Sequence, residues 1–250
     1  MNRIRKAHAV SGGSRRSVLK LSGSAAAWAM LGTSTVSTAA AAAALTKAQR
    51  DAMTPDDILA LMRKGNERFR KGKPEARDVL AQQRATAKGQ HPAAVLLSCI
   101  DSRAPAETIM DLGIGDVFNC RVAGNVVNED ILGSMEFACK LAGAKVVLVM
   151  GHTACGAVKG AIDNAELGNL TGLLAKIKPA VQATSYSGER TGENYGFVDT
   201  VANKNVQLTI AEIRKRSPVL AELETAKTIK IAGAMYNLET GVVDFFAPMS

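Results

Sequence analysis

The chain has 250 residues, of which 47% are hydrophobic and 22% are charged. These proportions are ordinary for a soluble globular protein and poorly match a disordered chain, a collagen-like fibre or a protein with many membrane spans. The formal net charge is +8, but residues 1–44 contain six Lys and Arg residues and no carboxylate. The rest of the chain is close to neutral and has no basic stripe with interleaved aromatic residues, so nucleic-acid binding is not expected.

The first 44 residues have the pattern of an export signal. The string SRRSVLK at 14–20 precedes a modestly apolar stretch over 21–36 and an Ala run over 39–44 that offers cleavage sites. This order resembles the twin-arginine signal of bacteria. We expect the twin-arginine export machinery to carry the protein to the periplasm, or otherwise out of the cytoplasm, with cleavage near Leu45. The alternatives are a basic tail and a retained anchor, although the apolar stretch falls short of the roughly 20 residues that a stable membrane anchor needs.

Residues 45–250 are predicted to form a single domain. Thr54 and Pro55 predict the start of a helix, because Thr is a good N-cap and Pro is tolerated at the first helical position. A second helix is predicted over 77–88.

The next part of the sequence alternates strands with helices. The runs 93–98 and 145–150 are short and uniformly apolar, as is typical of parallel strands covered on both faces. Further strands are predicted over 116–120, 228–236 and 242–246, and helices over 128–141, 155–164, 170–182 and 197–216. The last two strands are joined by a short turn. The pattern predicts an α/β fold, with a mostly parallel central sheet, an antiparallel edge strand and flanking helices.

Cysteine and histidine follow both of the central strands. Cys99 comes directly after the first apolar run, and His152 and Cys155 come after the second. Ligand sites of open α/β sheets lie at the carboxyl ends of the strands, so these side chains are expected to converge. Two thiolates and one imidazole are donors that zinc prefers, and three protein ligands leave a fourth position open. In an exported protein, a disulfide between Cys99 and Cys155 is the alternative.

The other two cysteines, Cys120 and Cys139, are interpreted as packing residues. Asp101 and Arg103 are two positions apart, so in an extended segment they lie on the same side and can form a bidentate ion pair. Beside a zinc ion, the Asp101 carboxylate could take the fourth coordination position or be held away from it by Arg103.

Three strings carry a family resemblance: SCIDSRAPAE at 98–107, FNCRVAGN at 118–125 and GHTACGA at 151–157. In their order and spacing they resemble the β-class carbonic anhydrases. The resemblance covers nearly all of the chain that follows the leader, and it implies that 45–250 is one catalytic domain of this class. It also implies a homodimer or a higher homo-oligomer.

The resemblance implies that Cys99, His152 and Cys155 bind one Zn²⁺ ion per subunit. It further implies that Asp101 and Arg103 form a catalytic dyad, in which Asp101 orients the zinc-bound water or accepts a proton from it. In a closed state Asp101 can become the fourth zinc ligand. The reaction implied is the reversible hydration of CO2 to bicarbonate and a proton, through zinc-bound hydroxide.

Four more residues match positions that bind substrate or line the cleft in the family: Gln90, Arg121, Gly124 and Asn125. The chain departs from the family at Val122, where many members have Asn. Two other functions stay open from the sequence. The same scaffold could hydrolyse carbonyl sulfide or carbon disulfide, or the protein could be a non-catalytic zinc or thiol protein.

Overall fold

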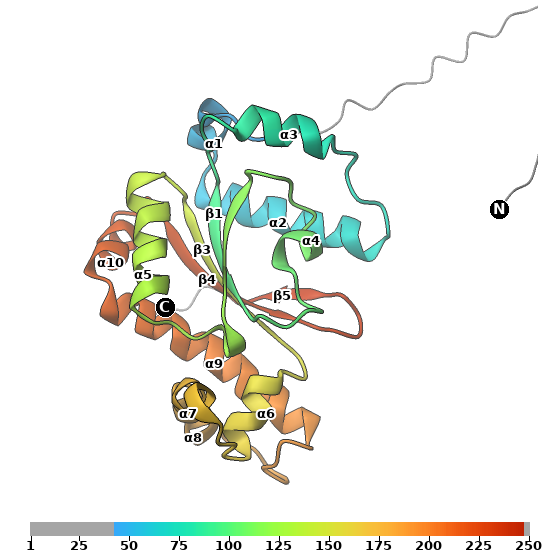
Figure 1. Ribbon diagram of the computed structural model, residues 1–250, viewed down its shortest axis with the longest axis vertical. Helices are drawn as coiled ribbons and strands as arrows, with labels where there is room; N and C mark the ends of the chain where they lie inside the picture. Colours follow the sequence, from blue (N-terminus) through green and yellow to red (C-terminus); the bar gives the residue numbers. More distant parts are fainter. Residues whose placement is uncertain (1–42, 248–250) are drawn as a thin grey trace, which may run out of the picture. The chain divides into compact units, whose positions relative to one another are not determined.

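The computed structural model describes residues 43–247, so the predicted leader lies outside the described residues except for its last two positions. A five-stranded sheet with the strand order β2-β1-β3-β4-β5 forms the centre of this part of the chain (Figure 1). The strands are β1 (Ala94–Ser98), β2 (Val117–Arg121), β3 (Val146–His152), β4 (Lys230–Tyr236) and β5 (Val243–Phe245). Strands β1 to β4 are parallel and β5 is antiparallel to β4. The predicted fold class is therefore confirmed.

Helices flank the sheet on both sides (Figure 1). They are α1 (Lys47–Ala52), α2 (Pro55–Arg70), α3 (Val79–Thr86), α4 (Ala106–Ile109), α5 (Glu129–Glu136), α6 (Gly156–Ile162), α7 (Gly168–Ala175), α8 (Lys178–Ala183), α9 (Tyr195–Arg216) and α10 (Pro218–Thr225). A 3₁₀ turn, η1 (Ala123–Asn125), and a π-turn, η2 (Phe137–Leu141), complete the secondary structure. Within residues 43–247, none of the helices has the length and apolar character needed to cross a membrane.

Side chains of the central strands alternate between two hydrophobic cores. Ala94 and Leu96 of β1 pack with residues of α2 and α4, whereas Val95 and Leu97 pack with residues of α5, α9 and α10. All four are fully buried. The uniform apolar character of this strand is thus explained by burial of both faces, as expected of a central parallel strand.

The helix start at Thr54 follows the predicted capping chemistry, and the start of α5 is capped in the same way. The Thr54 side chain accepts a hydrogen bond from the Asp57 amide at 3.1 Å, and Pro55 is the first residue of α2. The Asn128 side chain accepts one from the Ile131 amide at 2.9 Å at the start of α5. Each bond satisfies an amide that has no partner within its own helix.

The boundaries differ from the sequence prediction in three places. The single helix predicted over 170–182 is two helices, α7 and α8, and Pro179 lies in the first turn of α8, where its missing N–H breaks no helical bond. The helix predicted over 128–141 changes to a π-turn after Glu136. The short helices α1, α4 and α10 were not predicted, because few residues of each are buried and their apolar pattern is weak.

The strand order places the carboxyl ends of β1 and β3 side by side. From β1 the chain crosses to β2 on one side, whereas from β3 it crosses to β4 on the other. This divergence is the switch point at which open α/β sheets bind ligands. The parallel register pairs Ser98 with Met150, so Cys99 and His152 emerge at the same edge of the sheet.

Candidate metal centre

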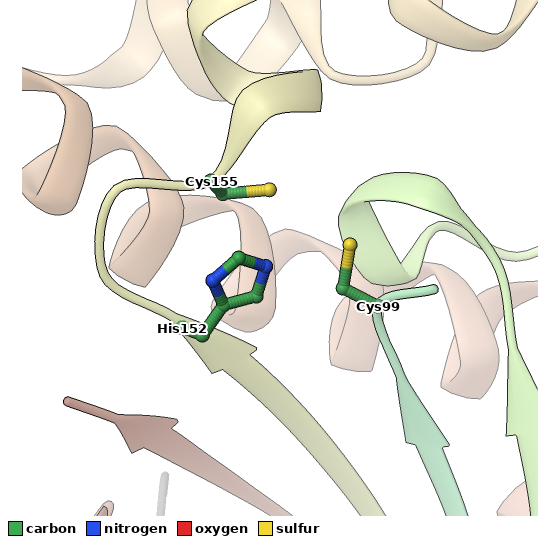
Figure 2. Close-up of side chains that lie close together, drawn as sticks. All are labelled: Cys99, His152 and Cys155. Atoms are coloured by element: carbon green, nitrogen blue, oxygen red, sulfur yellow. The ribbon is translucent and has the colours of Figure 1, made fainter. Parts of the chain in front are cut away.

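Three side chains from different elements converge at this edge. Cys99 directly follows β1, His152 is the last residue of β3, and Cys155 is the N-cap residue of α6. One ligand atom of each lies within 4.8 Å of the other two, and all three residues are buried. Figure 2 shows both sulfur atoms and the imidazole ring facing a common centre. The structure thus brings together the three residues that the sequence proposed as ligands.

The donor set fits a tetrahedral metal ion. Zinc held by sulfur and nitrogen at about 2.0–2.3 Å places its ligand atoms roughly 3.5–4 Å apart. The three atoms here lie within 4.8 Å of one another, which leaves room for this arrangement. The Nδ1 atom of His152 lies 2.9 Å from the Thr153 carbonyl oxygen, which makes Nδ1 the donor and leaves the lone pair on Nε2. That Nε2 atom is buried and has no hydrogen-bond partner among the described residues. A metal ion would supply the missing partner.

The cysteines are free thiols. None of Cys99, Cys120, Cys139 and Cys155 forms a disulfide, so the alternative pairing of Cys99 with Cys155 is not realised. Cys139 is buried in the core beneath α5, where desolvation raises the pKa of its thiol to about 12. Such a thiol is an inert packing group. Cys120 on β2 is half-buried, and desolvation likewise raises its pKa.

The two thiols at the centre have opposite electrostatic properties. A hydrogen bond from Cys155 is the main cause that lowers the pKa of Cys99 to about 4. The same hydrogen bond, together with burial, raises the pKa of Cys155, which keeps its proton. Burial lowers the pKa of His152, but Cys99, the Thr153 backbone and Asp101 together outweigh burial, so the net shift is upward. The three side chains share protons with one another, and a metal ion would take the place of those protons.

Backbone amides also stabilise the sulfur atoms. The Gly124 amide donates a hydrogen bond to Cys99 Sγ at 3.3 Å. On the other side of the centre, the amides of Ala157 and Val158 offset part of the rise in the pKa of Cys155. N–H donors to a thiolate reduce its excess charge, and such outer partners tune the ligands of a metal site.

The turn between His152 and Cys155 is held by tertiary contacts. Ala154 has a φ of 52°, a left-handed conformation that costs a residue other than Gly about 1–3 kcal/mol. Its amide donates a 2.7 Å hydrogen bond to Asp199 Oδ1 of α9. A hydrogen bond to a charged group contributes about 1.5–3 kcal/mol, enough to offset the strain. The Thr153 amide and hydroxyl are bound by the Tyr236 carbonyl and the Leu238 amide at 2.9 and 3.0 Å.

Asp101 and Arg103 form the predicted ion pair, but through a turn instead of an extended segment. The Arg103 backbone amide donates to Asp101 Oδ1 at 2.9 Å, and its Nε and Nη2 donate to Oδ1 and Oδ2 at 3.0 and 2.8 Å. The Arg103 hydrogen bond lowers the pKa of Asp101 to about 2. Asp101 Oδ2 remains 3.9 Å from His152 Nε2, so the carboxylate borders the centre while Arg103 holds it.

Residues 118–125 support the backbone of the turn that carries Cys99 and Asp101. Arg121 donates to the backbone carbonyls of Cys99 at 2.9 Å and Asp101 at 2.6 Å, and thereby fixes the turn that carries both residues. Gly124 has a φ of 66°, and a side chain there would collide with Ile177. Asn125 is buried, and its Nδ2 atom has no partner among residues 43–247. The contact of these residues with substrate stays a prediction.

Gln90 lies away from the centre within this chain. It is exposed in the loop that precedes β1, whereas Cys99 follows β1. A five-residue strand is about 17 Å long, so a full strand separates Gln90 from the ligands. Its assignment to the substrate site stays a prediction and would need a second copy of the chain.

Sequence reasoning missed Asp199 and Asn205, both on α9. Asn205 Nδ2 donates to the Gly124 carbonyl at 2.8 Å, and Asp199 accepts from Ala154. Neither residue stands in a local motif. The partner of Asn205 is 81 positions away and the partner of Asp199 is 45 positions away. Only the tertiary structure identifies them.

The fold and the site together define an α/β protein with a buried group suited to a metal ion at the switch point of its sheet. The family model for carbonic anhydrase matches residues 94–243. Carbonic anhydrase 2 of Mycobacterium tuberculosis is 35% identical over 186 residues, which are 72% of this chain and 87% of the relative. Carbonic anhydrase of Mycolicibacterium smegmatis is 34% identical over 185 residues, which are 73% and 89% of the two chains.

A solved structure agrees with these relatives. The β-carbonic anhydrase of Aspergillus fumigatus superposes with a TM-score of 0.57 and 29% identity, over 65% of this chain and 79% of that one. The chain belongs to the carbonic anhydrase family, in its β class.

Proposed function

We propose that the protein hydrates CO2 reversibly to bicarbonate and a proton, with one zinc ion held by Cys99, His152 and Cys155. The observation that carries the proposal is the buried Cys-His-Cys group whose imidazole Nε2 has no partner among the described residues. A bound zinc ion would lower the pKa of a water molecule far below its value in bulk water, to about 7, and so make a nucleophile available near neutral pH.

The residues around the centre would position such a water molecule. Asp101 borders the ligands, and its carboxylate oxygens are hydrogen-bond acceptors that would orient a water molecule held there toward the carbon atom. Arg103 fixes this carboxylate by three hydrogen bonds, and its own side chain is 57% exposed. We propose that Arg103 holds the Asp101 carboxylate beside the water during turnover and keeps this carboxylate from becoming the fourth ligand.

Metal analysis combined with stopped-flow CO2 hydration tests the proposed function. We expect close to one zinc ion per chain, loss of hydration after chelation, and recovery when zinc is restored. Carbonyl sulfide and carbon disulfide should be hydrolysed much more slowly than CO2 is hydrated. Active protein without a stoichiometric metal ion, or faster hydrolysis of either sulfur compound, would contradict the proposal.

We propose that the protein is a homo-oligomer assembled through the edge of its sheet. β2 is an edge strand, and its Phe118 ring packs edge-to-face with Phe137 at 6.1 Å. Phe137 is 50% exposed although it is large and apolar. An edge strand beside exposed aromatic surface favours pairing with a second copy. Sedimentation analysis should give at least a dimer for the wild type and a smaller species for Phe137→Glu; a monomeric wild type would refute the assembly.

We further propose that the protein is exported by the twin-arginine route and loses residues 1–44. Trp28 is the only tryptophan of the chain and lies in this leader. Protein recovered from the periplasm should therefore show no tryptophan emission and should have the mass of a chain that begins near Leu45. Replacing both Arg15 and Arg16 by Lys should retain a fluorescent precursor in the cytoplasm. A tryptophan signal from exported protein would show that the leader is kept.

A further inference from the structure

Helix α9 contacts the segments that carry His152 and Cys155 and also a segment that binds Cys99. It packs against β3 and against α6, which follow one another on either side of the 152–155 turn. It also packs against η1, which lies next to Cys99. In Figure 1, α9 runs beneath the sheet and reaches α6. A single helix of 22 residues therefore contacts the surroundings of the centre on both sides.

One polar contact from α9 reaches the His152 and Cys155 side of the centre. Asp199 Oδ1 accepts the amide of Ala154, which is the residue directly before Cys155 and has a positive φ. Release of this amide would let the turn relax toward the right-handed region that Ala prefers. Because Cys155 follows directly, such a change would redirect its sulfur away from His152.

A second polar contact reaches the Cys99 side. Asn205 is buried, and its Nδ2 donates to the Gly124 carbonyl at 2.8 Å. The amide of the same Gly124 donates to Cys99 Sγ. Asn205 therefore binds the carbonyl of the residue whose amide is the direct partner of a ligand sulfur, and this residue, Gly124, has a positive φ.

We propose that Asp199 and Asn205 are positioning residues that preset the three ligands: from one helix, Asp199 fixes the Ala154 backbone between His152 and Cys155, and Asn205 fixes Gly124, whose amide binds Cys99. Neither side chain is itself a ligand. Their effect is on the geometry of the free protein, in which the ligands already face one another. The inference rests on the proposed metal function, since it concerns the affinity and geometry of that same site.

Zinc affinity, measured by competition with a chromophoric chelator, tests the proposal. Loss of an outer partner of a metal ligand weakens binding about 10–100-fold, and we expect a weakening of this size for Asp199→Ala and for Asn205→Ala. Asp199→Asn keeps an oxygen acceptor for the Ala154 amide and should stay within a few-fold of the wild type. In the cobalt-substituted protein, the thiolate charge-transfer and d–d bands of the two Ala variants should shift, because they report the ligand geometry.

Asp163→Ala is the matched control. Asp163 also accepts one backbone amide, that of Gly192 at 2.8 Å, but Gly192 belongs to a segment without a ligand. This variant should bind zinc and give cobalt spectra like the wild type. Thermal unfolding of the metal-free proteins separates a change at the site from a loss of folding.

The outcomes are distinguishable. If the wild type binds no zinc, the proposed metal function fails. If the wild type binds zinc and Asp199→Ala and Asn205→Ala bind it equally well with unchanged cobalt spectra, the positioning role is wrong. It is also wrong if Asp163→Ala weakens binding as much as Asp199→Ala does, because the effect would then be general destabilisation.

Discussion

Replacement of His152 by Ala is expected to remove the bound metal and to lower kcat/KM for CO2 hydration by at least about a hundredfold. The estimate is a lower bound, because loss of an outer partner already costs 10–100-fold and His152 is a ligand itself. The substitution leaves the two sulfur ligands in place and removes the imidazole nitrogen. Metal content by elemental analysis and stopped-flow hydration measure the result.

His91→Ala is the control for this substitution. His91 is half-buried in the loop before β1, at the opposite edge of the sheet, and should leave the metal content unchanged. A full complement of zinc in the His152→Ala protein would show that the imidazole is not a ligand and would overturn the proposed centre.

Replacement of Asp101 by Ala is expected to lower the rate of hydration as well, but with zinc still bound. All three ligands are untouched, so the metal content should equal that of the wild type. The water loses the carboxylate that orients it, and a positioned group of this kind contributes about 10²–10⁴-fold to a rate. Stopped-flow kcat/KM values, normalised to bound zinc, are the appropriate measurement.

A surface carboxylate provides the comparison for Asp101→Ala. Asp56 on α2 is paired with Lys230 and is 76% exposed, so Asp56→Ala removes an Asp from an ion pair far from the ligands. It should leave both metal content and rate unchanged. An Asp101→Ala protein with an unaffected rate would refute the role given to this residue.

The fold was predictable because its central strands are apolar on both faces. Strands β1 and β3 are buried at every position. This burial is visible in the sequence as uniformly apolar runs. Parallel pairing then brings their carboxyl ends together, which is why three ligands separated by up to 56 positions could be placed at one site. Short helices such as α4 escaped prediction because four residues are too few to show a helical period.

The rest of the site depends on contacts that no local pattern encodes. The roles of Asp199 and Asn205 arise from the packing of α9 under two distant segments. Likewise, the hydrogen bonds from the Arg121 guanidinium to the backbone carbonyls of Cys99 and Asp101 could not be foreseen from its motif, whereas its contact with substrate stays a prediction. A residue type in a motif predicts which chemistry is available, but the direction of its side chain is set by the tertiary structure.

The division of the ligands between β1 and β3 means that the centre does not exist in an unfolded chain. Until the two strands lie side by side, Cys99 and His152 belong to separate stretches of polypeptide. Capture of an ion by all three ligands would therefore require the folded sheet, and the ion obtained would depend on what is available in the compartment where the chain folds, since affinity alone favours copper over zinc. If the chain is exported as we propose and folds before it crosses the membrane, the cytoplasm selects its metal.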